Sequence, residues 1–195
     1  MQLPARVGDF ELTVLLGEGG AGEVYGGTKG GLPVAVKMLR GDLELTERER
    51  QRFFDEATRM RRVTHPGIVA VLDAGTLPDG RPYLSMPRLE GETLAARIAR
   101  GPIPVDEALR FFAELAAAVS TLHATGLVHR DIKPENVFLA RDTSRPADKR
   151  VHAMLLDLGI ARDENAGSST TTLEGKTRGT PAYMAPERFF GSAAS

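Results

Sequence analysis

Residues 129–136 read His-Arg-Asp-Ile-Lys-Pro-Glu-Asn and place an acid, a cation and an amide at fixed offsets within one loop. Asp131 can orient an attacking hydroxyl group, Lys133 can neutralise a phosphoryl oxygen, and Asn136 can hold a metal ion. Phosphoryl transfer requires these three roles, because its catalysis consists mostly of positioning and charge stabilisation. The loop therefore predicts a phosphoryl-transfer site, provided that other segments supply the contacts to a nucleotide.

A glycine-rich segment near the N-terminus is the first such segment. Residues 16–24 read Leu-Gly-Glu-Gly-Gly-Ala-Gly-Glu-Val, so Gly17, Gly19 and Gly22 fit the pattern G-x-G-x-x-G-x-V. Glycines let a turn lie close over phosphates, where a Cβ would collide. An ordinary hairpin turn is one alternative, and a Rossmann dinucleotide fold, which continues into a helix, is another. Because the strand pattern of residues 33–37 follows, we expect the glycine loop to join two strands.

That strand pattern ends in a lysine. Alternating β-branched residues in Val-Ala-Val, residues 34–36, predict a strand buried on one face, which brings Lys37 into the same cleft as the glycine loop. A partner of opposite charge is available in the charged, helical segment 52–57. Glu56 is the predicted partner and Asp55 is the alternative; the ion pair would aim the ammonium group at the α and β phosphates.

A second carboxylate follows the catalytic loop. Residues 155–159, Leu-Leu-Asp-Leu-Gly, indicate an apolar strand that ends in Asp157. Carboxylate oxygens suit Mg²⁺, which takes few protein ligands and completes its shell with substrate phosphates, so Asp157 and Asn136 would form its protein ligands. Asp-Leu-Gly alone is an ordinary turn, but no generic turn explains residues 179–187, Gly-Thr-Pro-Ala-Tyr-Met-Ala-Pro-Glu, which follow it.

Together these motifs resemble the eukaryotic-like (Hanks-type) serine/threonine protein kinases, particularly the bacterial branch, over residues 10–187. The resemblance implies an α+β, two-lobe fold. Its N-terminal lobe, residues 1–86, would be an antiparallel sheet with one helix, and residues 87–91 would form a hinge. Residues 92–195 would be a mainly helical and incomplete C-terminal lobe.

The resemblance also implies a role for each motif. Asp131 would be the catalytic base, Lys133 would contact the γ-phosphate of ATP, and Asn136 and Asp157 would bind Mg²⁺. Thr180 would face the substrate and, with Lys133, is typical of the serine/threonine class. The residues that would cover or contact the ATP phosphates are Gly17, Glu18, Gly19, Gly20, Ala21, Gly22 and Lys37, the last paired with Glu56.

The adenine pocket follows from the same resemblance. Its expected lining comprises Leu16, Val24 and Ala35 above the base, Phe138 below it, Met86 as gatekeeper, and Pro87 and Leu89 in the hinge. Pro87 departs from the acidic residue that is usual in the family. Proline keeps its carbonyl group, and the family takes the N–H from two residues further on, here Leu89, so adenine recognition should survive.

The composition argues against several other classes of protein. The 195 residues carry a net charge of −1, which argues against a nucleic-acid face or a basic membrane-binding surface. The chain has no cysteine, and we find no signal-peptide core and no run of transmembrane length. We therefore expect a cytoplasmic protein with no disulfide and no membrane segment.

The periodicity places the motifs on elements. Residues 10–86 read as strand-rich, with turns at 26–33 and 75–82 and one helix over 46–63, whose Thr46 and Glu49 form a capping-box pattern. Helical spacing covers 93–100 and 105–125, and residues 140–150 read as a loop between two strands. His129 is expected to brace the catalytic loop.

A run of hydroxyl side chains lies in residues 163–178 and is usually no more than a linker. In the family this region is the activation segment, and Arg130 could pair with a phosphate there. The candidate phosphorylation sites are Thr170, Thr171, Thr172 and Thr177.

Only eight residues follow Glu187, whereas the family continues with further helices. We therefore expect a fragment or a natural short form, with exposed apolar faces that favour self-association. Two function classes remain. One is an ATP- and Mg²⁺-dependent kinase acting on protein Ser/Thr hydroxyls and capable of autophosphorylation; the other is a catalytically weak nucleotide-binding regulatory module.

Overall fold

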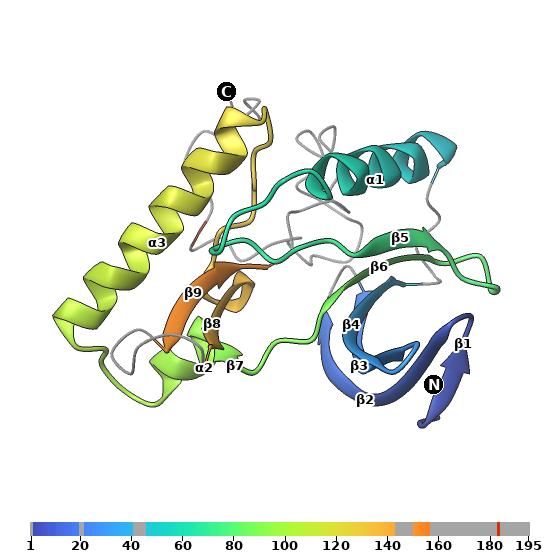
Figure 1. Cartoon of the computed structure of the whole chain (residues 1–195), viewed down its shortest axis with the longest axis horizontal. Coiled ribbons are helices and arrows are strands. Elements are labelled where there is room, and N and C mark those ends of the chain that lie inside the picture. Colours follow the sequence, from blue (N-terminus) through green and yellow to red (C-terminus); the bar gives the residue numbers. More distant parts are fainter. Residues whose placement is uncertain (1, 20–21, 41–45, 143–149, 157–182, 184–195) are drawn as a thin grey trace, which may run out of the picture.

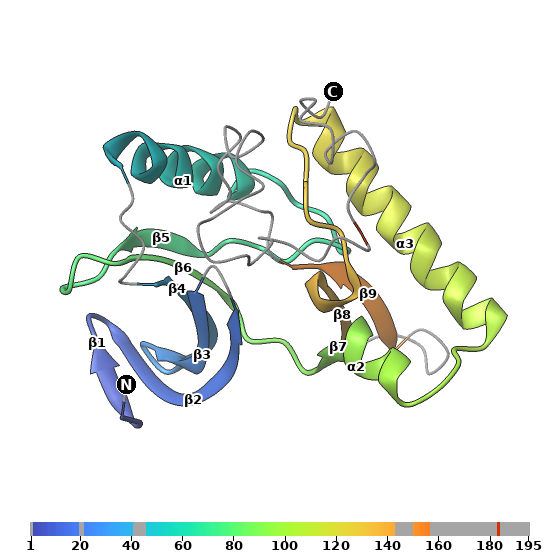
Figure 2. The ribbon, with the colours of Figure 1, turned by 180° about the vertical axis from the view of Figure 1, so that it is seen from behind.

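Two antiparallel sheets form the framework of the computed structural model, which describes residues 2–19, 22–40, 46–142, 150–156 and 183 (Figure 1). The larger sheet has the order β1-β2-β3-β4-β6-β5. Its strands are β1 (Ala5–Val7), β2 (Phe10–Gly19), β3 (Gly22–Lys29), β4 (Leu32–Leu39), β5 (Asp73–Thr76) and β6 (Pro82–Pro87). Figures 1 and 2 show that β1 to β4 curl strongly, with the helix α1 (Glu47–Met60) beside β5 and β6.

Strand β4 lies inside this sheet and is buried on both faces. Val34, Val36 and Met38 belong to a cluster with Phe10 that the curled sheet encloses, whereas Ala35 belongs to a second, larger cluster. The expectation of one buried face was therefore wrong. The alternation of side chains is real, but the curl of the sheet gives each face its own apolar cluster.

Helix α1 begins as predicted and ends earlier than predicted. The Thr46 N–H donates to Glu49 Oε2 at 2.7 Å and the Glu49 N–H donates to Thr46 Oγ1 at 3.3 Å, which completes the capping box. At the other end, Arg62 and Val63 donate to carbonyl groups only three residues back. These tighter turns end the α-helix at Met60 instead of residue 63.

The smaller sheet, with the order β7-β8-β9, belongs to the second part of the chain; the described residues there also form two helices and a short 3₁₀ turn. Its elements are β7 (Gly91–Thr93), α2 (Leu94–Ala99), α3 (Val105–Ala124), η1 (Pro134–Asn136), β8 (Val137–Arg141) and β9 (Val151–Leu155). Helices α2 and α3 match the predicted spans within one residue at each end. Strands β8 and β9 pair with each other as expected, whereas β7 was not predicted.

Both predicted turns were too long. The turn predicted at 75–82 loses residues 75 and 76 to β5 and residue 82 to β6, and the turn predicted at 26–33 is shortened further. Gly26 and Gly27 lie within β3, and a Cβ at Gly27 would stand 2.1 Å from the carbonyl oxygen of Glu11 on the paired strand. The turn itself is formed by Gly30 and Gly31, whose φ angles are 57° and 82°. The first two glycines therefore serve close strand packing and the last two serve the turn.

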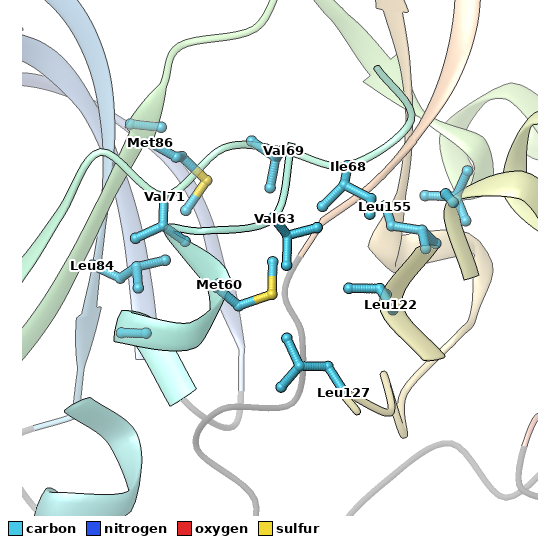
Figure 3. Packing of buried hydrophobic residues seen from close by; sticks show 14 of the residues in the cluster. Met60, Val63, Ile68, Val69, Val71, Leu84, Met86, Leu122, Leu127 and Leu155 are labelled. Carbon is cyan, nitrogen blue, oxygen red and sulfur yellow. The ribbon is translucent and has the colours of Figure 1, made fainter. Parts of the chain in front are cut away.

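The larger apolar cluster joins the two parts of the molecule (Figure 3). Segment 61–72 places Val63, Ile68, Val69 and Val71 between the sheet residues Leu84 and Met86 on one side and Leu122 of α3 and Leu155 of β9 on the other. Each such side chain contributes roughly 1.5–3 kcal/mol on burial, so this segment fixes the two parts against each other. Within the described residues, no helix combines the length and apolar character needed to cross a membrane.

Candidate active site

The glycine segment forms a β-hairpin. Strands β2 and β3 pair antiparallel up to Glu18 with Glu23 and Gly19 with Gly22. The glycine loop therefore joins two strands, as predicted, and a strand-to-helix dinucleotide motif is excluded. Gly20 and Ala21, at the tip, lie outside the described residues.

The three glycines of the pattern differ in what the fold demands of them. A Cβ at Gly22 would lie 2.0 Å from the carbonyl oxygen of Met38, so packing alone requires glycine there. At Gly17 and Gly19 a Cβ would meet no described atom within 4 Å, and neither has a φ in the left-handed range. Folding alone does not explain glycine at these two positions, whereas a phosphate lying close to the backbone would.

Several residues expected around adenine come together. Ala35 and Met86 are buried in the larger apolar cluster, and Val24 and Leu89 pack against it. Cδ1 of Leu16 lies 3.2 Å from where a Cβ of Gly26 would stand, so Leu16 covers that part of β3. Two further residues complete the predicted set: Pro87 pairs with Val34 at the end of β6, and Phe138 lies on β8 opposite Thr93.

Lys37 and Glu56 lie on β4 and α1. Lys37 is paired in the sheet with Val24 and with Leu84. Glu56 Oε1 lies 3.8 Å from Nη1 of Arg130, with about a quarter of each side chain exposed. The rival Asp55 is exposed and accepts a hydrogen bond from Gln51, 2.9 Å away. The predicted Lys37–Glu56 ion pair stays a prediction, and the contact with Arg130 is one that the sequence did not predict.

The catalytic loop gathers its acid, amide and cation at one point. Asn136 Nδ2 donates to Asp131 Oδ2 at 2.7 Å and to the Asp131 carbonyl oxygen at 2.8 Å. Lys133 Nζ lies 3.5 Å from the same Oδ2. The turn η1 makes this possible, because the Asn136 N–H donates to the Lys133 carbonyl oxygen and folds the chain back. The carboxylate thereby has a fixed orientation and a cation beside it.

His129 braces this loop, the role expected from the sequence. Its side chain is 2% exposed, and its Nε2 lies 2.8 Å from the carbonyl oxygen of Leu156. That carbonyl can only accept, so Nε2 carries the proton, and Nδ1 accepts a hydrogen bond from the Asp131 N–H at 3.3 Å. Because the buried ring is hydrogen-bonded through both of its nitrogens, His129 positions Asp131 and does not act as a base.

The donor set at the loop suits a hard cation. The amide nitrogen of Asn136 is directed at Asp131, which leaves its amide oxygen, the atom that Mg²⁺ prefers, available for a ligand. Leu156, the residue before Asp157, donates its N–H to the Asn136 carbonyl oxygen at 2.8 Å. Some of the predicted residues lie outside the described residues: Asp157, Thr170, Thr171, Thr172, Thr177 and Thr180.

The comparisons with known proteins decide the family. The model of the protein kinase domain matches residues 10–194. This chain belongs to the protein kinase family. The crystal structure of the Mycobacterium tuberculosis PknI kinase domain superposes with a TM-score of 0.70 at 26% identity, covering 91% of this chain and 70% of that one. The two-lobe kinase fold inferred from the motifs is thus confirmed.

The relatives also confirm the branch of the kinase family. The chain is 38% identical over 189 residues to serine/threonine-protein kinase pkn2 of Myxococcus xanthus, covering 95% of this chain and 22% of the relative. It is 40% identical over 190 residues to the DNA damage-responsive serine/threonine-protein kinase RqkA of Deinococcus radiodurans, covering 94% and 27%. The chain is therefore similar to bacterial serine/threonine kinases and spans about a quarter of the length of these two.

Proposed function

We propose that this chain carries the catalytic site of a kinase that transfers the γ-phosphate of ATP to Ser and Thr hydroxyl groups of proteins. The observation that supports this most is the geometry of residues 129–136, in which Asp131 is oriented by Asn136 and His129 and accompanied by Lys133. Asp131 would accept a hydrogen bond from the substrate hydroxyl and orient its oxygen for attack. Lys133 would offset negative charge on the transferred phosphoryl group.

Kinases of this family generally use ATP and Mg²⁺, and we propose the same for this chain. Bound Mg²⁺ would neutralise charge on the phosphates, with the Asn136 oxygen and Asp157 as its protein ligands. The roles of Gly17, Gly19 and Lys37 in holding the phosphates belong to the same proposal. So do the lobe boundaries at residues 86 and 92, with the hinge between them.

The proposal extends to partners and regulation. We propose that the chain acts on proteins with Ser or Thr hydroxyl groups and can phosphorylate itself. We also propose that it associates with further copies of itself and is located in the cytoplasm. A phosphate on one of the threonines at 170–172 or 177 would compete for Arg130, the residue that Glu56 contacts.

Calorimetric titration with Mg²⁺-ATP tests the nucleotide site. Lys37→Met should weaken binding by about tenfold or more, because a charge-assisted contact to phosphate is lost. Lys29→Met is the matched control, since Lys29 lies in the same sheet but pairs with Asp73. Unchanged affinity in Lys37→Met would refute the cleft assignment. ATP binding without transfer of radiolabelled phosphate to a protein acceptor by the unsubstituted chain would instead favour the regulatory module.

A further inference from the structure

Strand β9 is an edge strand of its sheet, and side chains of α3 cover its open edge. Nη1 of Arg110 donates to the carbonyl oxygen of Val151 at 2.6 Å. Two residues along the strand, the Ala153 N–H donates to Oε2 of Glu114 at 2.7 Å. Arg110 and Glu114 also contact each other at 3.6 Å, and each side chain is about a quarter exposed. The Arg110 cation thus donates to a backbone carbonyl group, and the Glu114 carboxylate accepts from a backbone N–H. Hydrogen bonds with one charged partner are stronger than those between neutral groups.

The spacing of the two elements explains the match. Four residues of helix span about 6 Å and two residues of strand about 6.7 Å, so every fourth residue of α3 can follow every second residue of β9. Four residues after Glu114 on α3 comes Ala118, which is fully buried. Beside this small residue lies Gly67, whose carbonyl oxygen accepts from the Leu155 N–H at 2.8 Å. The open edge of β9 is therefore bonded at residues 151, 153 and 155 in turn.

The residue after β9 connects this edge to the catalytic loop. Leu156 donates its N–H to the carbonyl oxygen of Asn136 at 2.8 Å, and its own carbonyl oxygen lies 2.8 Å from His129 Nε2. His129 and Asn136 both orient Asp131 through hydrogen bonds. A displacement of β9 would therefore move both supports of Asp131 together.

We propose that Arg110 and Glu114 are positioning residues for the catalytic loop, acting through β9 and Leu156. They fix the first part of the strand, and the strand positions Leu156 against His129 and Asn136, which hold Asp131. This inference rests on the proposed function only in calling the loop catalytic; the mechanical connection stands on the contacts themselves. Misplacement of a reacting group by about 1 Å can cost on the order of a hundredfold in rate, so small shifts of β9 matter.

Amide hydrogen exchange tests the connection on the chain itself. Glu114→Leu removes the acceptor of the Ala153 N–H, so the Ala153 and Leu156 amides should exchange about tenfold faster, as expected for losing a charged hydrogen bond. Glu114→Gln keeps an acceptor oxygen and should restore most of the protection. The control is Glu107→Leu, which removes an α3 carboxylate that contacts Arg97 of α2, 3.7 Å away, and should leave both amides at the parent rate.

Faster exchange at Ala153 with parent rates at Leu156 and Asp131 would overturn the inference, because β9 would then not transmit the change. If Glu114→Leu does not fold, Arg110→Met poses the same question through Val151. Phosphate transfer gives the second readout: Glu114→Leu should lower kcat with little change in the KM for ATP. Absence of transfer by the unsubstituted chain would count against the proposed function, whereas the exchange result would still decide the positioning role.

Discussion

The β2–β4 segment and the loop 129–136 are the two halves of one proposed site, and they are held in different ways. In the first half the backbone is fixed by strands that are adjacent in sequence, as in the pairing of Val24 with Lys37. In the second half the loop is held by hydrogen bonds from side chains and from distant backbone, such as His129 to Leu156. The first half should therefore tolerate changes of exposed side chains, whereas the second should depend on individual polar groups.

The largest effect is expected from Asp131→Asn in the second half. The substitution removes the charge beside Lys133 and presents a second amide to Asn136, so the proposed base is lost while the loop keeps its shape. Phosphate transfer should fall by roughly a hundredfold to ten-thousandfold, with Mg²⁺-ATP affinity little changed. Initial rates and calorimetry on the same preparation measure both quantities. Asp55→Asn, an exposed carboxylate on α1, is the control and should transfer at the parent rate.

The next largest effect is expected in the first half, where alanine variants of two glycines separate packing from nucleotide binding. Gly22→Ala places a Cβ against the Met38 carbonyl group and should lower the free energy of unfolding by about 2–3 kcal/mol. Gly17→Ala meets open space and should leave stability within about 0.5 kcal/mol while weakening ATP binding. Urea unfolding and nucleotide titration separate the two. Equal stability of both variants would show that strand pairing does not fix the backbone as argued.

The first half could be predicted from the sequence in more detail than the second. Hairpins and a capping box depend on residues close in sequence, so the glycine pattern, the strand at Lys37 and the N-cap of α1 at Thr46 were all predictable. The curl that buries both faces of β4 was not, because it depends on how distant strands pack.

In the second half, the motif identified Asp131, Lys133 and Asn136, whose contacts with one another are local. The contacts that anchor the loop to the rest of the fold join residues far apart in sequence, as His129 with Leu156. The Glu114 contact to Ala153 spans 39 residues, and the Arg130–Glu56 contact joins α1 to the loop. A sequence signal for the first exists in retrospect: Arg110 and Glu114 are a charged pair, four residues apart, flanking the buried Phe111 of α3. Charges next to the apolar face of a helix usually have a partner, but the sequence alone does not identify it.

The first half also has a side-chain contact between residues far apart in sequence, and it tests whether that half depends on strand pairing more than on polar side chains. Asp73 of β5 accepts from Lys29 Nζ at 2.8 Å and from the Tyr83 hydroxyl at 3.1 Å. Burial raises the pKa of Asp73, but these hydrogen bonds and the charge of Lys29 outweigh it, so the pKa lies below its ordinary value. A carboxylate with a lowered pKa stabilises the fold above the unfolded pKa of about 4, and this contribution is lost as the pH falls through the folded pKa.

Asp73→Asn should therefore lower the free energy of unfolding at pH 7 by about 0.5–1 kcal/mol, a modest value because about a third of each partner is exposed. The difference from the parent should shrink as the pH is lowered from 7 through the folded pKa of Asp73, where the parent carboxylate becomes protonated. Urea unfolding over this pH range provides the measurement. A loss of several kcal/mol would mean that side-chain contacts hold the first half as strongly as the second.

The smallest effect concerns an ion pair between α1 and the loop of the second half, Glu56 with Arg130. At 3.8 Å and with about a quarter of each side chain exposed, this ion pair should contribute a coupling of about 0.2–1 kcal/mol to the free energy of unfolding. A double-mutant cycle with Glu56→Gln and Arg130→Met measures this coupling by urea unfolding.

The sequence predicts Lys37 as the partner of Glu56, so a second cycle with Lys37→Met should be run with and without Mg²⁺-ATP. We expect coupling to Arg130 in the free chain and stronger coupling to Lys37 once nucleotide is bound, because contacts with the phosphates would restrict the Lys37 side chain. A free chain without coupling between Glu56 and Arg130 would contradict this expectation.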